Sequence, residues 1–220
     1  ARIYRTGWFH IFLSVRSKKV YKFVGLFVVK FLGLFNNVKV YNKRYLPAEG
    51  GYVIACTHTG WIDILNLGVS IYPKPIHFMA KKQLFDHKLL GWFITKMNAF
   101  PVDRENPGPS VLKVPMKLIK EGKVVGIFPS GTRNAEGASL KQGAVTISQL
   151  SKAPIIPAAY IGPNSPKEVF VRKKGYLIYG EPFYVTARGR EGREEFTHYL
   201  EEQLVTLKEQ LEEKISQQEH

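Results

Sequence analysis

The sequence predicts an α/β protein with a single mixed, largely parallel sheet flanked by helices and an N-terminal two-helix membrane motif. Three observations indicate this class. Short apolar runs bounded by turn residues alternate with amphipathic segments after residue 50. An apolar stripe of helical period fills the C-terminal region. The first residues are both basic and apolar. We therefore expect a membrane-binding motif at residues 1–40 and one folded domain at residues 41–220.

The N-terminal segment holds two short apolar runs, residues 8–15 and 23–35, on either side of a basic block. The longer run has 13 residues and is interrupted by Lys30, whereas a membrane-spanning helix needs about 20 apolar residues. We therefore expect two helices that lie in the interface of a bilayer. A hairpin packed on the protein's own core is the alternative. The aromatic side chains expected to enter lipid are Trp8, Phe9, Phe12, Phe23, Phe27 and Phe31.

The first half of the folded domain alternates between strand and helix signals. Residues 42–51 are rich in turn formers, and the apolar run 52–57 then predicts a buried strand. A helix is expected over residues 61–70, followed by a short strand at 76–79. Residues 93–100 lead into the segment 100–104.

The second half begins with a helix over residues 110–121, for which Ser110 is the expected cap and Gly122 the stop. Pro115 is expected to kink this helix. Strands are expected at 123–128, 154–160 and 175–180, with a short helix at 141–151. The last helix is expected at 191–216, where the apolar stripe consists of Phe196, Leu200, Leu204, Leu207, Leu211 and Ile215.

The chain carries a net charge of +14, from 32 Lys or Arg and 18 Asp or Glu. Residues 1–50 hold ten Lys or Arg and one Glu, whereas residues 191–220 hold three Lys or Arg and nine Glu. Because the basic end is also the apolar end, the charge favours a membrane surface over nucleic acid. Cys56 is the single cysteine, which excludes an internal disulfide and fits a reducing compartment. No Cys and His cluster has metal-ligand spacing, so we expect no metal site.

His58 and Asp63 stand between the first expected strand and the helix that follows it. On one continuous helix, five residues turn about 500°, which leaves the side chains roughly 140° apart. The two can meet if His58 lies in the loop and Asp63 lies in the first helical turn. Asp63 could then bind one imidazole nitrogen and leave the other to take a proton, as in general-base catalysis. The alternative is a loop histidine beside an aspartate that only complements the helix dipole.

Residues 128–133, Phe-Pro-Ser-Gly-Thr-Arg, directly follow another buried strand. Gly131 allows a sharp turn, Ser130 and Thr132 supply hydroxyl groups, and Arg133 is a bidentate ligand for anions. Strand ends in α/β sheets are the usual ligand sites, whereas a simple polar turn is the alternative. Further short motifs are the paired lysines of residues 80–85, the Asp-Arg that ends 100–104 and the Pro-Ile-Ile-Pro of 154–157.

Together and in this order, His-x4-Asp, Phe-Pro-Val-Asp-Arg, Phe-Pro-Ser-Gly-Thr-Arg and Pro-Ile-Ile-Pro resemble the lysophospholipid acyltransferase family, most of all its bacterial 1-acyl-sn-glycerol-3-phosphate acyltransferases. The resemblance covers residues 40–185 and implies the glycerolphosphate acyltransferase fold, with an acyltransferase domain at 41–220. Two residues depart from the family pattern. Ser130 stands where the family usually has Glu, and Pro101 stands where an aliphatic residue is more usual.

The resemblance also implies a role for each motif residue. His58 is expected to be the general base, and Asp63 the residue that orients it. Arg104 and Arg133 are expected to bind the phosphate of the acceptor, with Lys81 close by. The acceptor loop is expected to consist of Ser130, Gly131 and Thr132.

The reaction that the resemblance implies moves a fatty acyl group from acyl-acyl-carrier protein or acyl-CoA to the sn-2 hydroxyl of lysophosphatidic acid. We expect no cofactor besides this co-substrate, and a peripheral or monotopic location on the cytoplasmic face of the cell membrane. No Gly-x-Ser-x-Gly motif is present and Cys56 lies in an apolar run, which argues against a covalent acyl-enzyme. Two alternatives stay open: acylation of another lyso-lipid or of glycerol-3-phosphate, and a non-enzymatic lipid-binding module.

Overall fold

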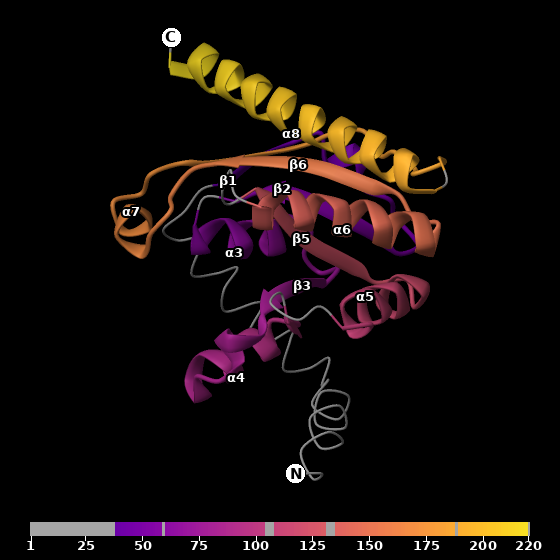
Figure 1. The fold of residues 1–220 in the computed structure, drawn as a ribbon. Coiled ribbons are helices and arrows are strands. Elements are labelled where there is room, and N and C mark those ends of the chain that lie inside the picture. The colour runs from indigo at the N-terminus through magenta and orange to yellow at the C-terminus, as the bar shows by residue number, and fades with distance from the viewer. Residues whose placement is uncertain (1–37, 59, 104–107, 131–134, 188, 220) are drawn as a thin grey trace.

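A computed structural model describes residues 38–58, 60–103, 108–130, 135–187 and 189–219, and the predicted N-terminal membrane motif lies outside them. Within this part of the chain, seven strands form one sheet in the order β1-β7-β6-β2-β5-β3-β4 (Figure 1). Every neighbouring pair is parallel except β6 and β7. The predicted mixed, largely parallel sheet is confirmed. The strands are β1 (Val38–Tyr41), β2 (Tyr52–Thr57), β3 (Ile76–Lys81), β4 (Phe100–Val102), β5 (Val124–Ser130), β6 (Ile155–Ile161) and β7 (Gly175–Tyr179).

Helices cover both faces of the sheet, and the central strand β2 shows which side chains meet them. Val53 and Ala55 belong to the core cluster under α5, α6 and α8, while Ile54 and Cys56 pack with Leu67 of α3 on the other face. Burial on both faces explains why β2 is a continuous apolar run. The helices are α3 (Trp61–Ser70), α4 (Lys88–Lys96), α5 (Ser110–Lys120), α6 (Ala135–Ser151), α7 (Pro166–Phe170) and α8 (Gly189–Glu219), with short 3-10 turns at Lys43–Tyr45 and Lys82–Phe85.

Helix α8 packs against β6, β7 and α6 along the stripe that the sequence predicts. Its side chains at the centre of the stripe are buried, and the two at the ends are partly buried. The expectation that this helix packs on the sheet is therefore confirmed. The buried members are Leu200, Leu204, Leu207 and Leu211.

Several elements differ from the sequence prediction. Helix α6 begins at Ala135, six residues before the predicted start at 141. Ser110 is the first residue of α5 and not its cap, since Pro109 occupies the N-cap position. Pro115 is buried inside α5, and the helix continues past it. Strand β1 is not predicted, and the expected boundary after residue 40 falls inside it. Helices α4 and α7 are also not predicted, because each is short and buries few side chains.

One end of the sheet, which we call the carboxyl end, collects the segments that carry the sequence motifs. Strands β2 to β6 all finish there, since they run parallel to one another. Thr57 at the end of β2 pairs with Ser130 at the end of β5. Strand β7 runs the opposite way and β1 is parallel to β7, so both begin at the carboxyl end, where Val38 lies opposite Gly175.

Candidate active site

His58 and Asp63 meet at the carboxyl end of the central strand. His58 directly follows β2, and Asp63 is the third residue of α3. Nδ1 of His58 lies 3.0 Å from Oδ1 and 3.1 Å from Oδ2 of Asp63. The loop-and-first-turn geometry that the five-residue spacing requires is therefore present.

The carboxylate of Asp63 has no exposed surface, while the side chain of His58 is 33% exposed. A buried carboxylate needs hydrogen bonds or an opposite charge to offset the loss of hydration. His58 supplies one partner, and the backbone N–H of Gly60 donates to Oδ2 at 3.0 Å. The position in the first turn of α3 adds the favourable field of the helix N-terminus. Asp63 thus fixes Nδ1 as the protonated nitrogen and leaves Nε2 to accept a proton.

The loop that carries His58 lies directly against the loop that follows β6. A Cβ atom on Gly60 would come within 2.6 Å of the carbonyl oxygen of Asn164. This is closer than any real Cβ contact, so the two backbones can approach only because residue 60 is glycine. The contact restrains the backbone that holds both His58 and the donor N–H to Asp63.

An aromatic ring supports the imidazole from β5. The ring of Phe128 lies 4.9 Å from that of His58 and stacks on Phe78 of β3 at 5.7 Å. From Ala55 to Thr57 strand β2 advances by two positions, whereas the paired positions on β5 advance by three, from Ile127 to Ser130. Strand β5 therefore carries a β-bulge at this step. Bulges re-aim side chains next to functional sites. Phe128 begins the Phe-Pro-Ser-Gly-Thr-Arg motif, but the sequence gives it no role of its own, because its contact with His58 depends on how β2 and β5 pair.

Cys56 is two residues from His58, yet its environment makes it unreactive. The side chain is fully buried in the cluster beneath α3. Burial raises the pKa of the Cys56 thiol well above its usual range, and the nearby negative charge of Asp63 raises it further. Because the thiolate is the nucleophilic form, the site offers no thiol nucleophile at this position.

Comparisons with known proteins identify the family. A family model described as "Acyltransferase" matches residues 37–161. A 1-acyl-sn-glycerol-3-phosphate acyltransferase of Bacillus subtilis is 52% identical over 202 residues, which cover 91% of this chain and 98% of the relative. The chain belongs to the acyltransferase family. A protein of the same name from Streptococcus pneumoniae is 32% identical to this acyltransferase over 164 residues, or 74% of this chain and 61% of the relative.

A solved structure shows the same fold. The crystal structure of the 1-acyl-sn-glycerophosphate acyltransferase of Thermotoga maritima superimposes on this acyltransferase with a TM-score of 0.63. The match covers 92% of this chain and 87% of the other, at 22% identity. At that identity the likeness concerns the fold alone.

The other predicted site residues of this acyltransferase are distributed around the same end of the sheet or lie outside the described residues. Lys81 is the last residue of β3 and pairs with Val102, so it lies at the carboxyl end. Lys82 beside it lies 3.7 Å from the carboxylate of Asp103. The backbone of Ser130 ends β5 opposite Thr57. The residues outside the described part are Arg104, Gly131, Thr132 and Arg133, together with the aromatic residues of the N-terminal segment.

Among the described residues, no group of three or more His, Cys, Asp or Glu side chains could hold a metal ion. Within the same ranges, no helix has both the length and the apolar character needed to cross a bilayer.

Proposed function

We propose that this acyltransferase transfers a fatty acyl group to the sn-2 hydroxyl of lysophosphatidic acid and so forms phosphatidic acid. The observation that carries the proposal is the contact of His58 Nδ1 with a fully buried carboxylate at the end of the central strand. The names of the relatives from Bacillus subtilis and Streptococcus pneumoniae support this choice of acceptor.

The proposed reaction proceeds without a covalent enzyme intermediate. Nε2 of His58 takes the proton of the sn-2 hydroxyl as the oxygen attacks the thioester carbonyl of acyl-acyl-carrier protein or acyl-CoA. The tetrahedral intermediate then collapses and the C–S bond breaks. The leaving thiolate takes the proton from the imidazolium, which returns His58 to its neutral form. Asp63 stabilises that imidazolium and fixes its tautomer. Backbone N–H groups near Gly131 are the proposed donors to the oxyanion.

Cations at the carboxyl end are proposed to bind the acceptor's phosphate. In the sequence, Arg104 follows β4 by two residues and Arg133 follows β5 by three, and the described ends of both strands are at the end of the sheet where His58 lies. Lys81 is at the same end and partly exposed. Guanidinium groups bind phosphate through two parallel hydrogen bonds, which orients the glycerol backbone as well as holding it. The sn-2 hydroxyl can then be presented to His58.

The N-terminal segment is proposed to hold the protein on the cytoplasmic face of the membrane, where the acceptor resides. Support comes from its attachment point. Val38 begins β1 at the carboxyl end of the sheet, so the segment is joined to the domain at the same end as His58. The acceptor can then reach the histidine while its acyl tail stays in lipid.

The decisive experiment is a product assay with purified full-length protein. Lysophosphatidic acid is offered with each thioester donor in turn, and phosphatidic acid is measured together with the released thiol. Product with either donor supports the proposal and identifies the carrier. Lysophosphatidic acid that stays unacylated with both donors, by a protein that acylates glycerol-3-phosphate or another lyso-lipid, would overturn the proposed acceptor.

A different acceptor is the second candidate, and the residue that favours it is Ser130. Ser130, at the end of β5, stands where this family usually has Glu. The acceptor loop therefore carries one negative charge fewer than is usual in the family. The same assay with a panel of lyso-lipid headgroups separates the candidates. A non-enzymatic lipid-binding module would show no thiol release with any acceptor.

A further inference from the structure

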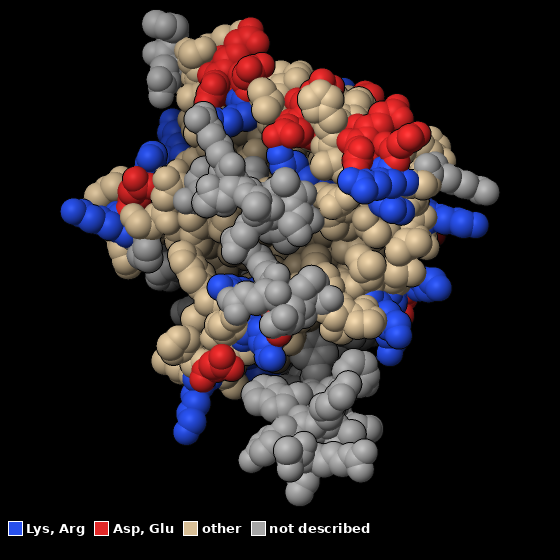
Figure 2. All heavy atoms as spheres, in the orientation of Figure 1, with Lys and Arg blue, Asp and Glu red and all other residues tan. Residues whose placement is uncertain are grey.

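The tip of α7 is a short surface, residues 170–174, that combines apolar and cationic side chains. Phe170 is 59% exposed and Val171 is 72% exposed, although both are large apolar residues. In Figure 2, Lys and Arg side chains project beyond the left-hand end of the molecule, where Figure 1 places α7. The exposed cations of the tip are Arg172, Lys173 and Lys174.

The α7 tip is fixed to the candidate active site by packing. Val169 is buried in a small cluster with Ile62 of α3, the helix that carries Asp63. Asn164, just before α7, is the residue whose carbonyl faces Gly60 in the His58 loop. Because β6 is parallel to β2, α7 follows β6 at the carboxyl end of the sheet. The tip therefore lies at the same end as His58.

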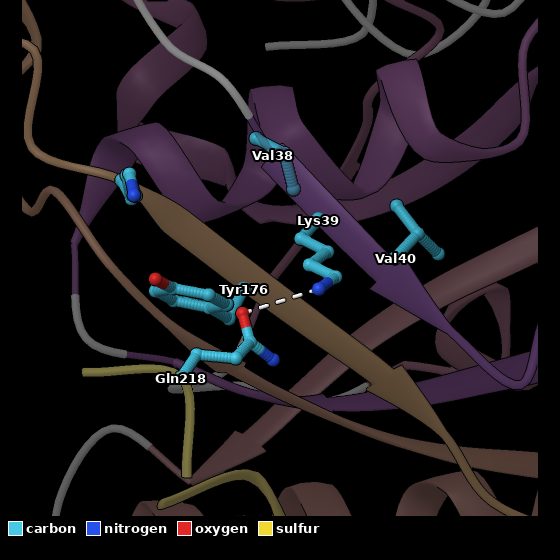
Figure 3. A pocket seen from close by; sticks show the side chains of 6 residues that line it. Val38, Lys39, Val40, Tyr176 and Gln218 are labelled. Atoms are coloured by element: carbon cyan, nitrogen blue, oxygen red, sulfur yellow. Dashed lines mark hydrogen bonds between the residues drawn. The ribbon is translucent and has the colours of Figure 1, made fainter. Parts of the chain in front are cut away.

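The α7 tip also lies beside the point where the N-terminal segment joins the domain. Lys174 lines a cavity of about 410 Å³ together with Val38, the first residue of β1. The same cavity holds Lys39, whose ammonium group donates a hydrogen bond to Gln218 at 3.1 Å (Figure 3). Lys39 is therefore a fourth cation, next to the three of the α7 tip.

Apolar exposure continues along this end of the molecule. Trp61 at the start of α3 is 55% exposed, and on α4 Leu89 is 81% and Trp92 is 56% exposed. In Figure 1, α7 lies at the left-hand end of the molecule, α3 lies left of centre, and α4 lies below α3. In contrast, acidic side chains gather over α8 (Figure 2), and they include exposed Glu209 and Glu212. An anionic surface would therefore repel the α8 side and attract the α7 tip.

We propose that the α7 tip is a second membrane contact, separate from residues 1–37, and that its partner is an anionic lipid bilayer. Phe170 and Val171 enter the interfacial region, and Arg172 and Lys174 contact lipid phosphates, whereas the ammonium group of Lys173 is paired with Glu168 at 3.4 Å. Apolar side chains flanked by cations are the composition of interfacial membrane anchors. Two separate contacts fix the orientation of the domain, whereas one tether leaves it free to rotate. This proposal goes beyond acyl transfer, since it concerns how the domain sits on lipid.

Arg172 offers a variant that does not threaten the fold. Its backbone has a φ of 57°, in the left-handed region that non-glycine residues rarely adopt. Glycine relieves this strain while it removes one cation. Lys152 is a matched control, because it has a φ of 54°, is exposed, and lies between α6 and β6 at the opposite end of the sheet.

The first test compares Arg172→Gly with Lys152→Gly in full-length protein. Binding is measured on vesicles of phosphatidylcholine with and without phosphatidylglycerol at low salt. Arg172→Gly is expected to weaken binding to the anionic vesicles about fivefold, since one cation near an anionic surface contributes about that factor. Lys152→Gly is expected to leave it unchanged. Equal binding by both variants would overturn the proposal. Acyl transfer in detergent micelles should be the same for both variants, which separates this result from a failure of the proposed reaction.

The second test reports directly on Val171. Cys56 is the only cysteine and is fully buried, so Val171→Cys places one accessible thiol on the molecule for an environment-sensitive fluorophore. Val205→Cys is the control, because Val205 is 53% exposed on α8. A blue shift on anionic vesicles at position 171 but not at position 205 is expected. A probe at 171 that stays in water on vesicle-bound protein would overturn the proposal. A shift that depends on protein concentration without vesicles would assign the tip to a second copy of the chain instead.

Discussion

Asp63 is completely buried, and both of its carboxylate oxygens lie within 3.1 Å of Nδ1 of His58. The imidazole and the N–H of Gly60 therefore help to offset the desolvation cost of burying this carboxylate. Stability and proposed catalysis depend on the same contacts. A substitution at either residue should consequently be measured both for turnover and for unfolding.

Replacing His58 by Ala is expected to lower kcat about 100- to 10,000-fold, because general-base catalysis contributes that much. The same change removes a hydrogen-bond partner from a buried carboxylate, so the free energy of unfolding should fall by about 1–3 kcal/mol. Asp63→Asn should reduce kcat less than His58→Ala, since the base remains but its tautomer is no longer fixed. Steady-state kinetics and urea unfolding of the three proteins provide the check. Near-normal turnover in His58→Ala would refute the proposed mechanism.

Gly60→Ala tests the close approach of two loops. The added methyl group would collide with the carbonyl of Asn164, and a shift of the Gly60 backbone to relieve the collision would disturb the N–H that donates to Asp63. We expect loss of both stability and turnover. Gly143→Ala inside α6 is the control, because a Cβ there meets nothing within 4 Å. Alanine in a helix interior should stabilise by about 0.5–1 kcal/mol. Similar melting temperatures for the two variants would contradict the close-approach interpretation.

Alkaline pH should destabilise the protein partly through Cys56. Burial raises the pKa of its thiol in the folded state, so the folded protein keeps the proton while the unfolded chain loses it above about pH 8.5. The contribution is therefore full below that pH and is lost as the pH rises, at about 1.4 kcal/mol per pH unit. Tyr52, whose pKa burial raises to about 12, acts in the same direction from about pH 10.

Cys56→Ala isolates the thiol's contribution to that pH dependence. The variant should show a shallower fall in unfolding free energy between pH 8.5 and pH 10, measured by urea titration at each pH. Its acyl transfer should stay within about threefold of the wild type. Loss of activity in a stably folded Cys56→Ala protein would point to a chemical role for the thiol after all.

Arg104→Ala and Arg133→Ala should act on the phosphate-bearing acceptor. Each is expected to raise the acceptor KM about 10- to 150-fold, the factor associated with one charge-assisted hydrogen bond. Arg133→Lys should restore only part of the loss, because the two-pronged geometry of guanidinium is missing. Initial rates with lysophosphatidic acid and with a phosphate-free acceptor supply the comparison. Equal activity on both acceptors in the wild type would argue against phosphate recognition.

Deleting residues 1–35 should release the protein from vesicles and impair transfer to acceptor embedded in a bilayer. The segment carries both apolar insertion and seven cations, of which insertion should dominate because salt screens the charges. High salt alone should therefore extract the full-length protein poorly, and detergent should extract it well. Vesicle flotation at low and high salt measures this. A truncated protein that unfolds would instead support packing of the segment on the domain.

The sequence was sufficient for features that depend on local pattern. The His58–Asp63 contact follows from a spacing of five residues across one strand-to-helix junction. Burial of Cys56 follows from its place in an apolar run. The alternation of strands and helices likewise follows from short-range periodicity.

Contacts between distant segments could not be predicted in this way. The ring of Phe128 meets His58 only because β5 pairs with β2 and bulges at that step. The approach of Asn164 to Gly60 joins loops that are far apart in the chain. Strand β1 was missed because its four residues form a strand only through pairing with β7. No local periodicity carries information about such partners.

The pairing of Val38 with Gly175 also constrains the order in which the protein can form. Strand β1 is the first strand in the described part of the chain, and its partner β7 is the last strand to be synthesised there. At cellular elongation rates, a delay on the order of 10 s separates the two strands, so the sheet stays incomplete at this border while most of the chain emerges. Such a long-range parallel pairing is also slow to nucleate. The N-terminal segment therefore leaves the ribosome well before the domain it serves can close behind it.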